Sequence, residues 1–232
     1  MLFHKELPLE QLNHVIADKA VHIHDYSKSK SDFTRKRKLD AETLIKVTLN
    51  MQGNSLNAEL FDAFPDIQQR MTASAYEQAK AKVSPNIFKD IFDDYNRTMT
   101  FPKRLCARKH YRVYAVDGCD FNIPYSKNSE FTVDRSEWKN SKSDEPMKPF
   151  SMIHANMMFD LMNRTYQDCI LQPRSKANER DAAIDMIKRI DNQTPFIVIM
   201  DRGYSAFNVF ENCNRINNCY YIIRTNIGSA AK

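Results

Sequence analysis

Glycine is scarce in this sequence, and its scarcity excludes several large classes of enzyme. Only four glycines occur in 232 residues, and none lies close to another. The glycine-rich phosphate loops of dinucleotide-binding folds and of P-loop hydrolases need two or three glycines within a short segment. The GxSxG elbow of serine hydrolases is missing as well. The sequence therefore predicts neither dinucleotide binding of the usual type nor P-loop nucleotide hydrolysis.

Paired cysteines and long apolar runs are also missing. The five cysteines are an odd number without a CxxC pair, which argues against a disulfide framework or a zinc knuckle. No apolar stretch approaches the roughly 18 residues that cross a bilayer, and the first ten residues lack a secretory core. We expect a cytoplasmic protein with reduced thiols and no membrane partner.

Positive charge is concentrated in the first half of the chain. Residues 1–112 contain 19 Lys and Arg against 14 Asp and Glu, whereas residues 113–232 contain 15 of each kind. This excess favours binding to a polyanion such as nucleic acid, although a solvated basic surface would have the same composition. The densest basic cluster is a run of four residues, Arg35, Lys36, Arg37 and Lys38.

The first half, residues 1–110, has the pattern of consecutive helices. Capping residues predict helix starts at Asp40, Ser55, Ser74 and Ser84, and Glu77 completes a capping box with the third. Two short capped helices before a longer one could form a helix-turn-helix-like reader of DNA, and a plain helical bundle fits the same pattern. In a DNA reader, five residues would face the nucleic acid: Thr72, Ser74, Gln78, Lys80 and Lys82.

The pattern changes to alternating strands and helices from residue 111. Five segments have the composition of strands, namely residues 111–116, 152–159, 165–171, 196–200 and 220–225. Two segments have a helical period, residues 178–190 and 207–216. The polar segment 126–149 predicts a long surface loop. The order strand, hairpin, helix, strand, helix, strand predicts a mixed sheet with right-handed crossovers, an α/β fold.

Two predicted strands end in an aspartate that is followed closely by a glycine, at Asp117 and at Asp201. Open α/β sheets carry their chemistry at the carboxyl ends of strands, so these aspartates lie side by side if their strands are neighbours. Adjacent carboxylates repel, and a divalent cation relieves the repulsion. The pattern favours a shared metal site, although strand-end aspartates also often cap only the following loop. His154, inside a predicted strand, is expected to be buried and hydrogen-bonded.

Several stretches of the sequence resemble insertion-sequence transposases of the DDE class, in the insertion-sequence-four family. The N-terminal region of that family is similar to FTRKRKL at 33–39, SLNAELFDAF at 55–64 and ASAYEQAKAKVSPNIFKDIFDDYN at 73–96. Its first catalytic motif is similar to YAVDGCDFNIP at 114–124, and the helix before its second motif to NERDAAIDMI at 178–187. The second motif, DRGY, and the next strand are similar to VIMDRGYSAFNVFENC at 198–213 and YYIIRTN at 220–226.

This resemblance implies a ribonuclease-H-like catalytic domain over residues 111–232 and a helical DNA-binding region over residues 1–110. Asp117 and Asp201 would be the first two acids of the Asp-Asp-Glu triad, which holds magnesium or manganese and catalyses DNA cleavage and strand transfer. The implied partners are double-stranded DNA, as transposon ends and target, and a second copy of the chain. The predicted DNA-binding residues are Arg35, Lys36, Arg37, Lys38, Gln78, Lys80, Lys82, Arg202 and Arg224.

The third acid of that triad has no counterpart here. The family places it after a β-rich insertion, within a Tyr-x-x-Arg-x-x-x-Glu pattern. Tyr221 and Arg224 fit the first two positions, but Gly228 stands where the glutamate belongs. This fit comes too soon after Asp201 to leave room for the insertion, so we interpret it as a coincidence. The only acid after Asp201 is Glu211. We therefore expect an incomplete ribonuclease-H-like sheet, truncated before the third acid, and little cleavage by this chain alone.

Three other functions fit parts of the sequence. A catalytically inactive remnant would bind DNA and inhibit an intact transposase. A stand-alone metal-dependent nuclease would use Asp117, Asp120 and Asp201, and it would cleave DNA without joining it. A structural protein that only retains the fold fits least well, because both aspartate motifs are intact.

Overall fold

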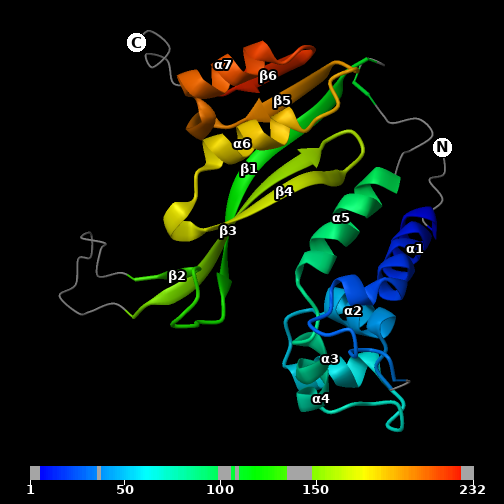
Figure 1. Ribbon diagram of the computed structural model, residues 1–232. Coiled ribbons are helices and arrows are strands. Elements are labelled where there is room, and N and C mark those ends of the chain that lie inside the picture. The colour runs from blue at the N-terminus through cyan, green and yellow to red at the C-terminus, as the bar shows by residue number, and fades with distance from the viewer. Residues whose placement is uncertain (1–5, 36–37, 99–105, 108–109, 135–147, 226–232) are drawn as a thin grey trace. The chain divides into compact units, whose positions relative to one another are not determined.

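The computed structural model describes residues 6–35, 38–98, 106–107, 110–134 and 148–225. The chain divides into two compact units, Met1–Phe101 and Pro102–Lys232. In the described ranges the first unit is helical apart from one isolated bridge, and the second contains a six-stranded mixed sheet with two helices (Figure 1). No described helix is long and apolar enough to span a bilayer.

Two apolar clusters hold the first unit together. Its helices are α1 (Glu6–Val21), α2 (Ala41–Asn50), α3 (Leu56–Ala63), α4 (Ala73–Lys80) and α5 (Asn86–Thr98), with a short 3-10 helix at Ile23–Asp25. One cluster joins α1, α2 and α5 through Ile16, Ile45, Ile87 and other buried side chains. The other joins α2, α3 and α4 around Tyr76, which is fully buried. Each cluster forms because apolar residues recur at helical spacing and are removed from water together.

The helix starts follow local capping signals, with one exception. Asp40 accepts a hydrogen bond from the amide of Thr43 at 2.8 Å, and the cap predicted at Ser55 is present as well. The start predicted at Ser74 is wrong. The N-cap of α4 is Thr72, whose hydroxyl accepts from the amide of Ala75 at 3.2 Å. Thr72 has the extended backbone that an N-cap needs, so α4 begins earlier and Ser74 lies within its first turn.

The sheet of the second unit has the mixed topology that the sequence predicts. Its strands are β1 (Arg112–Ile123), β2 (Thr132–Val133), β3 (Phe150–Asp160), β4 (Thr165–Pro173), β5 (Phe196–Met200) and β6 (Cys219–Ile223). The order is β2-β3-β1-β5-β6, with β4 also paired to β3. The pairs among β1, β2, β3 and β4 are antiparallel, whereas β5 is parallel to both β1 and β6.

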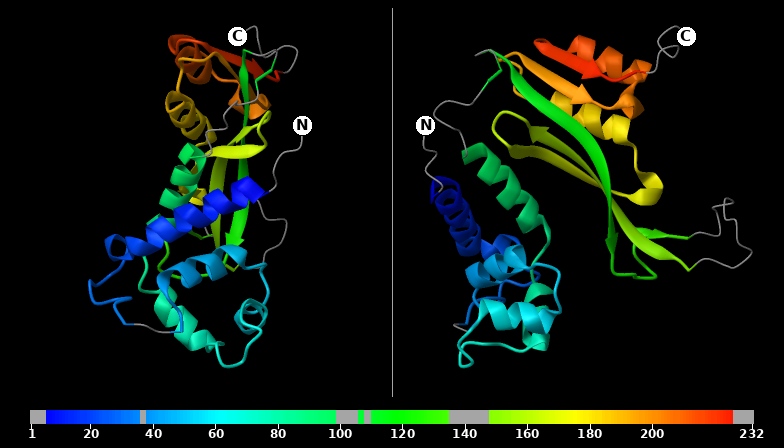
Figure 2. Two further views of the ribbon diagram at one scale, coloured as in Figure 1. Left: turned by 90° about the vertical axis from the view of Figure 1, so that its right-hand side faces the viewer. Right: turned by 180° about the vertical axis from the view of Figure 1, so that it is seen from behind.

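Helices α6 (Glu179–Lys188) and α7 (Phe207–Arg215) make the crossovers to β5 and β6 and pack against the sheet (Figures 1 and 2). The core between them contains Tyr114, Met158, Ile187, Val198 and Val209, all nearly inaccessible to water. This burial of contiguous apolar surface is the main stabilising term of the unit.

Strand β1 is longer than its composition predicts. It continues past residue 116 to Ile123, because β3 pairs with it as far as Ser151. The two strands therefore extend beyond β5 and β6 toward β2 (Figure 2). The predicted loop 126–149 contains β2, and its residues 135–147 lie outside the described part of the chain.

Candidate functional site

Asp117 and Asp201 occupy neighbouring positions on two parallel strands. Strands β1 and β5 pair in a register that places Val116 opposite Met200, and each aspartate is the next residue of its strand or strand end. Residues in register on adjacent strands point to the same face of a sheet. Both aspartates are exposed to solvent. The condition for the expected side-by-side placement, that the two strands are neighbours in the sheet, is therefore met.

Each of these carboxylates is held by one backbone amide. Asp117 accepts from the amide of Gly118 at 2.9 Å, and Asp201 accepts from the amide of Gly203 at 2.7 Å. The second bond caps a short 3-10 helix, η4 (Arg202–Tyr204). Asp201 therefore also has the capping role that the sequence left open as the alternative to metal binding. Among the described residues neither carboxylate forms an ion pair, and the second oxygen of each carboxylate makes no hydrogen bond.

A buried tyrosine, Tyr204, follows Asp201 in the short helix η4. Tyr204 is 1% exposed, and within the described part of the chain its hydroxyl has no hydrogen-bond partner. Burial raises the pKa of Tyr204 well above its usual range, and the negative charges of Glu179, Asp117 and Asp201 raise the pKa further. The phenol is therefore held in its neutral form.

Glu179 is the site residue that sequence reasoning missed. It is the first residue of α6, and the fold brings it next to Gly118, where an added Cβ would lie 3.2 Å from its carboxyl carbon. The available signal was its place at the start of the predicted helix 178–190, within the NERD stretch.

A second set of charged residues lies beside this site, on β1, on β3 and on the short 3-10 helix Arg174–Lys176 that follows β4. His154 is 2% exposed; its Nδ1 lies 2.6 Å from Asp120, and its Nε2 contacts Glu179 at 3.3 Å without hydrogen-bond geometry. Arg174 contacts the other oxygen of Asp120 at 3.0 Å. The expectation of a buried, hydrogen-bonded His154 is confirmed. Asp120 is engaged by two basic groups, which disfavours the nuclease alternative in which it acts with Asp117.

The donor set at Asp117 and Asp201 fits a hard divalent cation. In the described ranges no three His, Cys, Asp or Glu side chains lie close enough together to hold a metal ion. Two carboxylates with an unbonded oxygen each are nevertheless what Mg²⁺ commonly takes from a protein, because water and substrate phosphates complete its octahedron. Manganese prefers the same oxygen ligands.

Arg202 and Arg224 both lie at the carboxyl end of β5. Arg202 follows Asp201 directly, and the amide of Arg224 donates to the carbonyl of Met200 at 3.3 Å. Both side chains are exposed, and neither forms an ion pair with another described residue. The sequence-predicted phosphate contacts of the second unit are thus placed beside the predicted catalytic acids.

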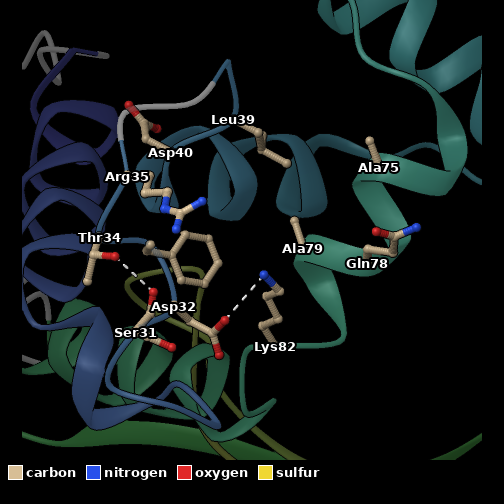
Figure 3. A pocket seen from close by; sticks show the side chains of 11 residues that line it. Ser31, Asp32, Thr34, Arg35, Leu39, Asp40, Ala75, Gln78, Ala79 and Lys82 are labelled. Atoms are coloured by element: carbon tan, nitrogen blue, oxygen red, sulfur yellow. Dashed lines mark hydrogen bonds and ion pairs between the residues drawn. The ribbon is translucent and has the colours of Figure 1, made fainter.

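Three of the predicted DNA-binding residues of the first unit line one pocket. Arg35, Gln78 and Lys82 surround a cavity of about 750 Å³ between α4 and the segment before α2 (Figure 3). Lys82 forms an ion pair with Asp32 at 3.2 Å across this pocket. Arg35 and Gln78 are exposed.

The other predicted basic residues of the first unit are not gathered there. Lys80 lines a separate pocket of about 270 Å³. Lys38 is exposed and donates a hydrogen bond to the carbonyl of Gln68. Lys36 and Arg37 lie outside the described residues.

Comparison with known proteins connects the second unit to one family. The model of the transposase DDE domain family matches residues 108–230. Among solved structures, the chain is similar to the piggyBac transposase in its synaptic complex with hairpin DNA, with a TM-score of 0.54 and 11% identity over 96% of this chain. The chain spans 51% of that protein's length, and at this identity the likeness concerns the fold. A search of curated proteins finds no match.

Proposed function

The chain belongs to the family of transposase DDE domains, and we propose that it is the catalytic and DNA-binding part of an insertion-sequence transposase of the insertion-sequence-four type. The observation that carries this proposal is the placement of Asp117 and Asp201 at matching positions of two parallel strands. A ribonuclease-H-like site needs acids on adjacent strands, and the pairing of β1 with β5 supplies them. The DRGY sequence around Asp201 supports the assignment to that branch of the family.

In this proposal Asp117 and Asp201 hold Mg²⁺ or Mn²⁺, in agreement with the general use of divalent metals by DDE transposases. When bound, the metal stabilises negative charge on the entering and leaving oxygens of phosphoryl transfer. The protein contributes fixed geometry. The β1–β5 ladder sets the spacing of the two residues, and the amides of Gly118 and Gly203 hold one oxygen of each carboxylate, while the other oxygen makes no hydrogen bond with a described residue.

Double-stranded DNA is the proposed partner, bound by both units, with a second copy of the chain in a paired-end complex. The basic excess of residues 1–112 and the exposed Arg202 and Arg224 beside the carboxylates support this choice. The piggyBac structure, which is a synaptic complex with hairpin DNA, supports it by analogy of fold.

We further propose that this chain alone cleaves DNA poorly, because the third acid of the family's pattern is not among its residues. The only acid after Asp201 is Glu211, and it is engaged with Arg215 on α7. A DNA-binding remnant that inhibits an intact transposase is the second candidate, and the same observation favours it.

Metal binding tests the site directly. Calorimetric titration of the whole chain with Mn²⁺ should give binding that Asp117→Asn and Asp201→Asn each abolish, because each removes one charged ligand. The asparagine retains the oxygen that accepts from the glycine amide, so the fold is preserved. Asp185→Asn, an exposed acid on α6, is the matched control and should bind normally. Unchanged Mn²⁺ binding by Asp201→Asn would overturn the proposed site.

DNA binding and cleavage test the activity. The chain should bind duplex DNA with an affinity that falls steeply as salt rises, because arginine and lysine contacts release counterions. An affinity that stays flat between low and physiological salt contradicts a DNA-binding role. Strong magnesium-dependent nicking that Asp201→Ala abolishes would show that the two acids suffice, and cleavage without joining would then favour the nuclease alternative.

A further inference from the structure

Eight arginines of the second unit lie in the described ranges, and three of them form ion pairs. Arg174, Arg189 and Arg215 pair with acids, and Arg112 donates to the carbonyls of Asp191 and Thr194. Besides Arg112, four arginines form no ion pair with another described residue: Arg164, Arg180, Arg202 and Arg224. Arg164 lies in the turn between β3 and β4. The remaining three gather around the carboxyl end of β5, so arginines without an ion pair are concentrated beside Asp201.

Arg180 is the member of this group whose side chain is fixed. It lies in the first turn of α6 and is exposed, and its Nε donates to the carbonyl of Gly203 at 2.8 Å. The amide of Gly203 donates in turn to Asp201 at 2.7 Å. One glycine of η4 therefore connects the guanidinium to the proposed catalytic carboxylate. The four N–H donors on the two Nη atoms form no hydrogen bond with another described residue.

The position of Arg180 favours an anion nearby. A cation in the first turn of a helix opposes the helix dipole, at a cost in free energy. The two acids of that turn have contacts of their own: Asp181 accepts from the side chain of Asn178 at 2.6 Å, and Glu179 contacts His154. A phosphate bound to the free edge of the guanidinium would remove that cost, because an anion is favoured both by arginine and by a helix N-terminus.

We propose that Arg180 binds a backbone phosphate of the DNA strand that lies on Asp117 and Asp201, and so positions that strand for cleavage. This inference rests on the proposed function. The carboxylates of Asp117 and Asp201 repel a phosphodiester, and an arginine bonded to the turn after Asp201 offsets that repulsion where the strand must approach. The planar fork of arginine also fixes the direction of the phosphate, which the point charge of a lysine would not do.

The test compares three variants of the whole chain in equilibrium binding to a fluorescein-labelled DNA duplex. Fluorescence anisotropy is measured over a series of KCl concentrations in EDTA, so that no cleavage occurs and only monovalent counterions are counted. Arg180→Gln should bind about tenfold more weakly, as expected for one charge-assisted contact. Its slope of log affinity against log salt should be shallower by about 0.9. Arg164→Gln, which removes another exposed arginine without an ion pair, should change neither quantity.

Arg180→Lys separates charge from geometry. It should retain the salt slope of the unmodified chain, because the positive charge stays near the phosphate, while the affinity falls because the fork and the bond to Gly203 are lost. Thermal melting by circular dichroism establishes that each variant is folded.

Three results would overturn the inference, and they differ from one another. If the unmodified chain binds with its salt slope and Arg180→Gln behaves like Arg164→Gln, the assignment of Arg180 is wrong and the proposed function stands. If the unmodified chain does not bind DNA, the proposed function fails and this inference fails with it. An Arg180→Lys slope as shallow as that of Arg180→Gln would also contradict a phosphate contact.

Discussion

Gly118 lies between the proposed catalytic acid Asp117 and the side chains of His154 and Glu179. Replacing Gly118 with alanine should disturb the packing of His154 and the position of strand β1 next to Asp117. A Cβ at this position would lie 2.7 Å from Nε2 and 2.9 Å from Cε1 of His154. It would also lie 3.2 Å from the carboxyl carbon of Glu179. Separations below 3 Å are not tolerated between heavy atoms of this kind, so the histidine ring or strand β1 must move.

The cost follows from how firmly His154 is held. Its side chain is 2% exposed and its Nδ1 lies 2.6 Å from Asp120, so the ring cannot turn away into solvent. Overpacking of a buried site costs about 1–3 kcal/mol. The backbone of Gly118 is not left-handed, so alanine recovers about 0.4–1 kcal/mol by restricting the unfolded chain. The free energy of unfolding should therefore fall by about 1–2 kcal/mol.

Urea unfolding followed by circular dichroism measures this loss, with the slope on urea concentration expected to be unchanged. A double-mutant cycle identifies the cause. In a His154→Ala background the clash is absent, so Gly118→Ala should there cost less than about 0.5 kcal/mol. If Gly118→Ala is harmless, or costs the same with and without the His154 side chain, the steric reasoning is refuted.

Three further predictions concern buried hydroxyls and a helix cap. Tyr204→Phe should leave stability unchanged or raise it by up to about 1 kcal/mol, whereas Tyr76→Phe should lower it by about 1 kcal/mol. The Tyr204 hydroxyl has no partner among described residues and that of Tyr76 bonds Thr48 at 2.7 Å, so equal urea midpoints would contradict this contrast. Because the folded pKa of Tyr204 is raised, its contribution to stability is complete below about pH 10 and is lost as pH rises further, and Tyr204→Phe should flatten that alkaline loss. Asp40→Ala should cost about 1 kcal/mol by uncapping α2, and Asp40→Ser should restore most of it.

Local signals predicted most elements, and the exception is informative. Asp40 stands alone before an apolar helix, so no other residue competes for the N-cap. Before α4 both Thr72 and Ser74 can cap, and the sequence offers no means of choosing. The choice depends on tertiary packing, because α4 buries Tyr76 among α2 and α3.

The chemistry of the site was partly visible in the sequence. An aspartate after an apolar strand and before a glycine occurs twice, which is why Asp117 and Asp201 could be selected. Glu179 could not be selected in this way, because acids are common in the first turn of any helix, where they interact favourably with the helix dipole. Only the crossing of α6 over the sheet brings it near Gly118 and Tyr204.

The sequence by itself determined most of the strands and helices, though not β2 or the second half of β1, and it placed an aspartate after the apolar part of each of the two central strands. These features depend on periodicity and on neighbours a few positions away. The tertiary structure decided that β1 and β5 pair in a register that sets Asp117 beside Asp201. It also decided that Asp120 is engaged by His154 and Arg174, and that Arg180 is tied to the turn after Asp201. These relations join residues far apart in the chain, and they exist only once the strands have paired and α6 has packed.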